Sequence, residues 1–140
     1  MKGIVIYDSK YNTTKEIAEK LRKRRKGMEI FAVEELSPFK LKEADFIILG
    51  SPIYYGRLSK GMENLLKDLD FRKRIRGRPL VIFTVSLWKC KKYLSNFRKF
   101  LEEERVVMEY SFGGKFGPFD RRKEREIDEF VEILRGSYGN

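Results

Sequence analysis

Short apolar runs alternate with amphipathic segments along the whole chain. Mainly apolar runs of strand length occupy residues 3–7, 28–33, 46–49, 80–85 and 106–112. The segments between them carry apolar residues at helical spacing, and we expect helices over residues 17–26, 59–74, 93–101 and 127–134. This alternation predicts a parallel β-sheet with helices packed on both faces.

The five predicted strands have one leading arrangement. Crossover connections between parallel strands are right-handed, and a five-stranded doubly wound sheet favours the order 2-1-3-4-5. Ligands of such sheets bind beyond the carboxyl ends of the strands, near the switch between the first and third strands. No linker, repeat or low-complexity stretch divides the sequence, so we expect one α/β domain over residues 1–140.

The loop after the first strand has the composition of a phosphate site. It reads Ser9-Lys10-Tyr11-Asn12-Thr13-Thr14 and passes directly into a helical pattern. A helix N-terminus offers free N–H groups and a positive dipole end, to which hydroxyl and amide side chains can add hydrogen bonds. The loop lacks both the glycine fingerprint of dinucleotide sites and the Walker sequence, which favours a mononucleotide such as FMN. The alternative is that Thr13 or Thr14 only caps the helix.

Aromatic residues follow the third and fourth predicted strands, whose ends meet the first loop. The third strand continues into Ser51-Pro52-Ile53-Tyr54-Tyr55-Gly56. A tyrosine ring at this edge could stack on a flat isoalloxazine ring or pack beneath its own loop. The fourth strand is followed by Ser86-Leu87-Trp88, where the only tryptophan could cover the other side of a flavin or the core.

The amino-acid composition limits the catalytic and metal-binding roles that the side chains can have. The chain has no histidine and one cysteine, Cys90, so the commonest general base and metal ligand is absent and no internal disulfide forms. We expect no metal site and no catalytic side chain, with the reactivity supplied by a cofactor. No apolar run has the length of a membrane span, and we expect a cytoplasmic protein. The charge-rich, histidine-free composition resembles that of thermophile proteins.

The loops resemble those of a known family. Residues 9–14 resemble the phosphate loop of flavodoxins, and residues 50–61 resemble the second flavin loop of the flavodoxin-type protoporphyrinogen dehydrogenases; residues 112–116 also fit that branch. The resemblance implies a flavodoxin-like fold that holds FMN by its phosphate and its ring. The cofactor-binding residues that we assign at this stage are Ser9, Lys10, Tyr11, Asn12, Thr13, Thr14, Ser51, Pro52, Ile53, Tyr54, Tyr55, Gly56, Ser86, Leu87 and Trp88.

The chain departs from the family pattern at two places. Lys10 and Tyr11 stand where flavodoxins often carry small hydroxyl residues. The stretch after Gly114 is also shorter than in the protoporphyrinogen dehydrogenases, where an insertion is thought to serve membrane or substrate contact. The short stretch counts against porphyrin and membrane-quinone chemistry.

The net charge of +10, from 31 basic and 21 acidic residues, falls into two groups of positions. Dense basic runs at 20–26 and 72–78 lie at predicted helix C-termini, where cations complement the helix dipole and face away from the ligand edge. A second set is expected nearer the ligand: Arg57, Lys60, Lys89, Lys91, Lys92 and Lys115. Since typical flavodoxins are acidic, this basic rim should favour the anionic reduced flavin and raise its reduction potential.

These observations favour an FMN-dependent oxidoreductase that passes electrons between FMN and a quinone, a porphyrinogen or a partner protein. The alternatives are an electron carrier without substrate chemistry and a flavin-free basic module that binds a partner or nucleic acid. No recognised nucleic-acid motif accompanies the charge, so nucleic acid is the less favoured partner, and a dimer is left open. A phospho-acceptor receiver domain is excluded because the third strand ends Leu49-Gly50-Ser51, without the acceptor aspartate.

Overall fold

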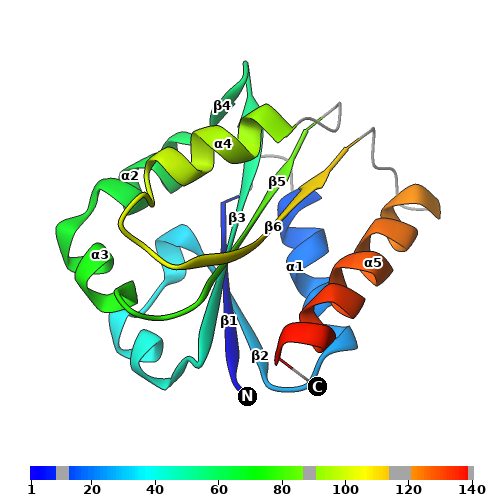
Figure 1. Cartoon of the computed structure of the whole chain (residues 1–140), viewed down its shortest axis with the longest axis horizontal. Helices are drawn as coiled ribbons and strands as arrows, with labels where there is room; N and C mark the ends of the chain where they lie inside the picture. Colours follow the sequence, from blue (N-terminus) through cyan, green and yellow to red (C-terminus); the bar gives the residue numbers. More distant parts are fainter. Residues whose placement is uncertain (9–12, 87–90, 114–120, 139–140) are drawn as a thin grey trace.

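Five parallel strands form the centre of the computed structural model, which describes residues 1–8, 13–86, 91–113 and 121–138. These strands are β1 (Gly3–Tyr7), β2 (Met28–Ala32), β3 (Phe46–Tyr54), β5 (Leu80–Val85) and β6 (Val106–Phe112). The short β4 (Arg57–Leu58) pairs antiparallel with the end of β3. The parallel strands lie in the order β2-β1-β3-β5-β6, which confirms the predicted 2-1-3-4-5 arrangement (Figure 1).

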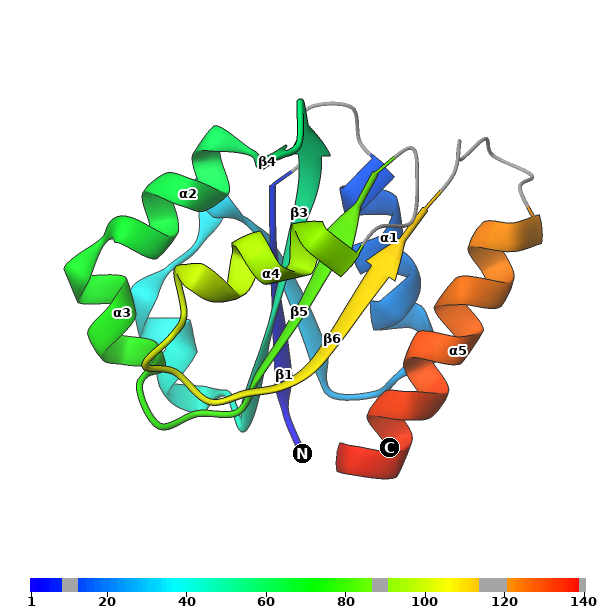
Figure 2. The same ribbon diagram turned by 45° about the horizontal axis from the view of Figure 1, so that its top comes forward.

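Helices cover both faces of the sheet (Figures 1 and 2). One face carries α1 (Thr13–Arg24) and α5 (Arg121–Tyr138). The other face carries α2 (Lys60–Lys67), α3 (Leu69–Ile75) and α4 (Lys91–Lys99). Two 3-10 helices that the sequence pattern did not predict, η1 (Val33–Glu35) and η2 (Pro38–Glu43), connect β2 to β3.

Alternate strand residues divide the hydrophobic core into two layers. Val5 and Phe83 face α1 and α5, whereas Ile6 and Ile82 face the opposite helices. All four side chains are fully buried. This burial explains the continuous apolar runs in the sequence, because a strand covered on both faces needs apolar residues at every position.

Close packing at the centre of the sheet depends on Gly50. Gly50 lies opposite Phe83 in the parallel register, and a Cβ atom at Gly50 would come within 2.1 Å of the Phe83 ring. That ring packs edge-on against Phe112 and Phe130, with centroids 5.5 and 5.9 Å away. Because Phe83 is held on several sides, it has little freedom to make room for a larger residue at position 50.

The helix predicted over residues 59–74 is two helices. Asp68 separates α2 from α3 and adopts an extended backbone. Its Oδ1 atom accepts hydrogen bonds from the backbone N–H groups of Asp70 (2.9 Å) and Phe71 (3.2 Å). A single-helix prediction was wrong here because an aspartate can cap a new helix more favourably than it continues an old one.

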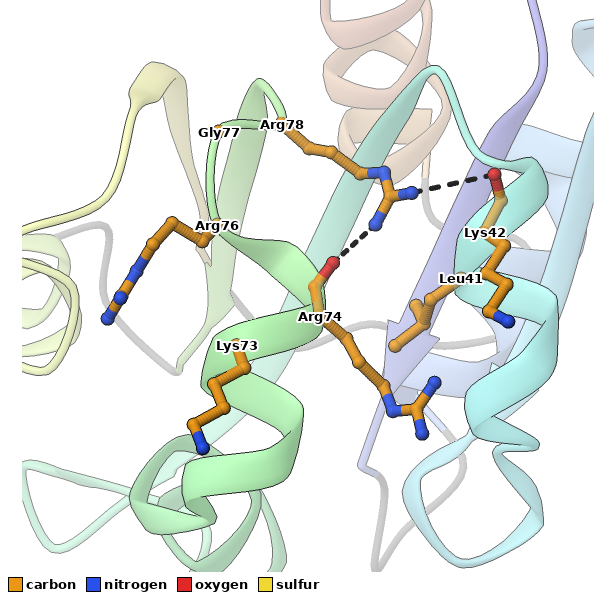
Figure 3. A pocket seen from close by; sticks show the side chains of 7 residues that line it. All are labelled: Leu41, Lys42, Lys73, Arg74, Arg76, Gly77 and Arg78. Carbon is orange, nitrogen blue, oxygen red and sulfur yellow. Dashed lines mark hydrogen bonds between the residues drawn. The ribbon is translucent and has the colours of Figure 1, made fainter.

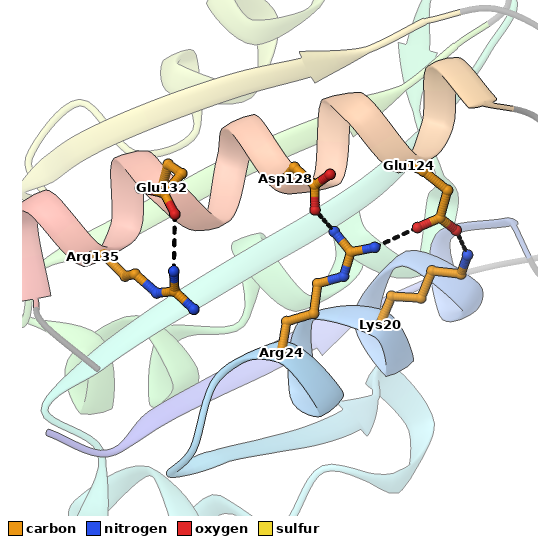
Figure 4. A network of polar contacts seen from close by, with 6 residues as sticks. All are labelled: Lys20, Arg24, Glu124, Asp128, Glu132 and Arg135. Carbon is orange, nitrogen blue, oxygen red and sulfur yellow. Dashed lines mark hydrogen bonds and ion pairs between the residues drawn. The ribbon is translucent and has the colours of Figure 1, made fainter.

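Part of the basic run at 20–26 joins helices instead of facing solvent. Lys20 and Arg24 of α1 form ion pairs with Glu124, and Arg24 also pairs with Asp128, so that α1 is tied to α5 (Figure 4). Arg25 is buried, and its guanidinium lies 4.9 Å from the centroid of the Phe46 ring. Burial lowers the pKa of Arg25 from its ordinary value.

We predict that Gly50→Ala destabilises the protein by about 1–3 kcal/mol, because the added methyl group overpacks the site next to Phe83. Gly136→Ala is the matched control, since Gly136 lies in α5 and a Cβ atom there has nothing within 4 Å. The control should stabilise the protein by about 0.5–1 kcal/mol through helix propensity. Urea unfolding measures both changes. A Gly50→Ala variant with the same free energy of unfolding as the parent would contradict the close approach of Gly50 to the Phe83 ring.

Candidate functional site

The carboxyl ends of the central strands lie at one edge of the sheet. Tyr7 pairs with Gly50, Gly50 pairs with Phe83, and the backbone N–H of Asp8 donates to the Gly50 carbonyl at 3.2 Å. The first turns of α1, α2 and α4 lie at the same edge, as the two views of the ribbon show (Figures 1 and 2). We call this the carboxyl edge, and it is where the sequence predicted a ligand.

The start of α1 holds a buried hydroxyl group. Thr14 is the second residue of α1, and its side chain is 1% exposed. Its Oγ1 atom has no hydrogen-bond partner among the described residues. Because an unsatisfied buried hydroxyl costs about 1–3 kcal/mol, a ligand atom that bonds it at the helix N-terminus would be strongly favoured. Thr13, also predicted, is half-buried beside it.

Four other predicted phosphate contacts cannot be compared with the structure. Ser9, Lys10, Tyr11 and Asn12 lie outside the described residues. Their assignment therefore stays a prediction from the sequence.

Asp8 and Gly61 bring the end of β1 against the start of α2. A Cβ atom at Gly61 would lie 2.4 Å from Oδ2 of Asp8, so only glycine permits this approach. A carboxylate next to the first turn of a helix interacts favourably with the helix dipole. Sequence analysis did not single out this pair. The signal was present in the glycine that closes the segment 50–61.

Ser51 fastens the end of β3 to α2. Its Oγ donates to the carbonyl of Pro52 at 2.9 Å and accepts from the backbone N–H of Ser59 at 3.1 Å. Ser59 in turn caps α2, with its Oγ accepting from the N–H of Met62 at 3.3 Å. The Ser51 hydroxyl is thus buried within the protein, and its contact with a cofactor stays a prediction. Ser59, which the sequence analysis missed, was recognisable as a serine just before an apolar helical pattern.

Tyr55 occupies a strained position at the tip of the β3–β4 hairpin. Tyr54 pairs with Arg57, and the two residues between them, Tyr55 and Gly56, have φ angles of +51° and +76°. A two-residue hairpin turn with positive φ at both positions prefers Asn or Gly first and Gly second. A tyrosine there costs about 1–2 kcal/mol. Its side chain is also fully exposed, at 104% of its reference area.

The hairpin is supported by α4. The Asn96 side-chain amide donates to the Gly56 carbonyl at 3.4 Å, and the Tyr93 ring lies 3.9 Å from where a Cβ of Gly56 would be. An aromatic residue held in a strained conformation and presented to solvent on a supported turn is an arrangement typical of a binding surface.

The other predicted ring contacts divide into three groups. Pro52 is buried and pairs with Val85, whereas Ile53 and Tyr54 are half-buried in the hairpin. Ser86 follows β5, and its backbone N–H donates to the Phe112 carbonyl at 3.1 Å. Leu87 and Trp88 lie outside the described residues, as does Cys90. The structure therefore brings the start of α1, the hairpin and the end of β5 to one edge.

A pocket of about 480 Å³ lies at the opposite edge, between η2 and the end of α3 (Figure 3). Its lining consists of Leu41, Lys42, Lys73, Arg74, Arg76, Gly77 and Arg78. The Arg78 guanidinium donates to the carbonyls of Arg74 and Lys42. None of the predicted cofactor residues lines this pocket. The basic run at 72–78 thus belongs to a surface remote from the carboxyl edge, as the helix C-terminal position predicted.

Residues 1–8, 13–86, 91–113 and 121–138 contain no cluster of three metal-ligating side chains. Nor do they include a helix with the length and apolar character needed to cross a membrane.

Comparison with known structures shows the same fold in flavin proteins. An archaeal flavodoxin is 19% identical with a TM-score of 0.73, and the alignment covers 97% of this chain and 98% of that chain. A Lactobacillus acidophilus flavoprotein in complex with FMN is 19% identical (TM-score 0.69; 91% and 97% covered). General stress protein 14 of Treponema denticola, also in complex with FMN, is 10% identical (TM-score 0.74; 97% and 99% covered).

The sequence itself matches one family, described as a flavodoxin domain, over residues 4–117. No curated protein matches the chain. The family match and the FMN complexes among the structural relatives support FMN as the cofactor. Over most of its length, from β1 to beyond β6, this chain belongs to the flavodoxin domain family.

Proposed function

We propose that this protein binds FMN at the carboxyl edge and transfers electrons through it. The observation that carries the proposal is the buried Thr14 hydroxyl at the N-terminus of α1, which has no hydrogen-bond partner within residues 1–8, 13–86, 91–113 and 121–138. A phosphate oxygen supplies the missing acceptor, and the helix dipole favours its negative charge. The flavodoxin relatives that hold FMN share this fold, which supports the same choice of ligand.

The phosphate end of FMN is assigned to Thr13, Thr14 and the N-terminus of α1. The sequence adds Ser9, Lys10, Tyr11 and Asn12 from the preceding loop. The flavin ring is assigned to the hairpin, where Tyr55 is exposed and can stack on a flat surface. Ser86, Leu87 and Trp88 are proposed for the other side of the ring.

When bound, FMN supplies one-electron and two-electron chemistry that the side chains lack. The chain would hold the cofactor, cover both sides of its ring and set the charge around it. Arg57 and Lys60 are exposed at the carboxyl edge, and positive charge there stabilises an anionic reduced flavin. We propose a protein as the electron partner. Reduction of a quinone or oxidation of a porphyrinogen is the enzymatic alternative. Assays of the FMN-loaded protein with each substrate distinguish these reactions from electron transfer to a protein.

Thr14→Val should weaken FMN binding about 10- to 150-fold, since a hydrogen bond to a charged group contributes about 1.5–3 kcal/mol. The same variant should leave the FMN-free protein as stable as the parent or more stable, because valine removes a buried unsatisfied hydroxyl. Quenching of flavin fluorescence measures the affinity, and urea unfolding measures the stability.

Riboflavin and Thr14→Ser are the controls for this test. Riboflavin lacks the phosphate, so its affinity should not change in Thr14→Val, and Thr14→Ser should retain FMN binding. Equal loss of both flavins, or no loss of either, would contradict the phosphate assignment.

Tyr55→Asn should show the complementary pattern. Asparagine tolerates positive φ, so the FMN-free protein should gain about 1 kcal/mol of stability. Loss of the ring should weaken FMN and riboflavin alike, by roughly 3- to 10-fold. Tyr55→Phe keeps the ring and should bind both flavins like the parent. If Tyr55→Asn retains full affinity for both, the ring does not stack on the flavin.

The midpoint potential of the bound flavin tests the basic rim. Arg57→Gln combined with Lys60→Gln should lower the midpoint, because the anionic reduced flavin loses favourable charge. Lys73→Gln combined with Arg76→Gln removes the same charge at the opposite edge and should leave the midpoint nearly unchanged. A redox titration with indicator dyes measures both variants, and equal shifts would rule out a local effect.

A further inference from the structure

Basic residues begin α2 and α4 at the carboxyl edge, where acidic residues are normally favoured. Lys91 and Lys92 are the first two residues of α4, and the first turn of α4 has no acidic residue. Lys60 is the first residue of α2. Cations at a helix N-terminus oppose the helix dipole, so these positions reduce the stability of the helices that carry them.

The hairpin adds a fourth cation to the same part of the surface. Arg57 is in β4, which packs against α4, and its side chain is 77% exposed. The nearest carboxylate, Glu63, is largely buried and lies 3.8 Å from the Arg57 guanidinium. We call Arg57, Lys60, Lys91 and Lys92 the basic corner; Tyr55 projects from the hairpin tip beside it.

Two cations in the last turns of other helices are placed differently. Arg24 ends α1 and pairs with two carboxylates of α5. Arg74 is in the last turn of α3 and pairs with Asp70 at 3.0 Å. These residues have favourable dipole positions and acidic partners. The lysines at the start of α4 have neither a favourable dipole position nor an ion pair within the described residues, so fold stability does not account for them.

We propose that the basic corner is the docking surface for an acidic electron-transfer protein, which approaches the flavin over Tyr55; this rests on the proposed function. The four cations come from β4, α2 and α4, and β4 belongs to the hairpin that exposes the Tyr55 ring. A surface drawn from three elements suits a protein face better than a small anion. Aromatic residues and arginine are enriched at the centres of protein interfaces. Complementary charge raises the rate of encounter and makes it fall with ionic strength.

The test measures electron transfer to the oxidised, FMN-loaded protein by stopped-flow absorbance. The donor is a reduced plant-type [2Fe–2S] ferredoxin, a strongly acidic protein. One electron leaves the reduced cluster and one electron enters FMN. We expect the second-order rate constant to fall about 10-fold or more between about 20 mM and about 500 mM salt.

Charge reversal locates the docking surface. Lys91→Glu combined with Lys92→Glu should slow the reaction with ferredoxin about 10-fold at low salt, and it should fold well because glutamate is favoured at a helix N-terminus. Lys73→Glu combined with Arg76→Glu makes the same charge change at the opposite edge and should alter the rate less than about 2-fold. Equal slowing by both pairs, or by neither, overturns the proposal.

Two measurements keep this test separate from the proposed function. FMN binding is measured first, by fluorescence, for every variant. Reduction by methyl viologen radical, a small cation, should not slow in Lys91→Glu with Lys92→Glu, because the flavin is still accessible. Absence of FMN binding would overturn the proposed function, whereas normal FMN binding with a salt-independent ferredoxin rate would overturn only the docking surface.

Discussion

The parallel register around β3 is the constraint on which the rest of the molecule depends. β3 has β1 on one side, β5 on the other and a hydrophobic layer on each face. Strands in one direction can be joined only by crossovers, so the helices run back along the sheet and begin at its carboxyl edge. Gly50 lets β3 pass close to the Phe83 ring, and β3 then continues into the hairpin. The same pairing that buries the core thus gathers Thr14, Tyr55 and the first turn of α4 at one edge.

Much of this arrangement could be predicted from the sequence, because buried parallel strands appear in it as continuous apolar runs. The strand order was confirmed, and each predicted apolar run lies within one of the five parallel strands or overlaps it. The predicted end of the third strand at residue 49 was wrong, because β3 continues to Tyr54. The break at Asp68 was missed because apolar residues keep helical spacing on both sides of it, while the break depends on one side chain bonding two N–H groups. The β3–β4 hairpin was also missed, since only the pairing of Tyr54 with Arg57 reveals its turn.

In the candidate site too, the sequence pattern predicted which residues lie there, but not which hydrogen bonds they make. Thr14 was predicted from its place after a strand and before a helix. The structure adds that its hydroxyl is buried and has no hydrogen-bond partner in the part of the chain that the structure describes. Ser51 was predicted as a ligand contact, and the structure shows that its hydroxyl joins β3 to α2. A sequence pattern shows which residue types follow a strand. It cannot show which hydroxyl is already bonded within the protein, because that depends on residues from another element.

The left-handed conformation of Tyr55 has a consequence for how this protein can evolve. A screen for heat resistance without flavin would enrich asparagine or glycine at this position and so discard the aromatic ring. If Tyr55 stacks on the flavin as proposed, a screen with flavin present would retain the tyrosine, because ligand binding would offset its strain. The residue enriched at position 55 would therefore differ between the two screens. Comparing the two enriched libraries would show whether a ligand was bound during selection, without any assay of electron transfer.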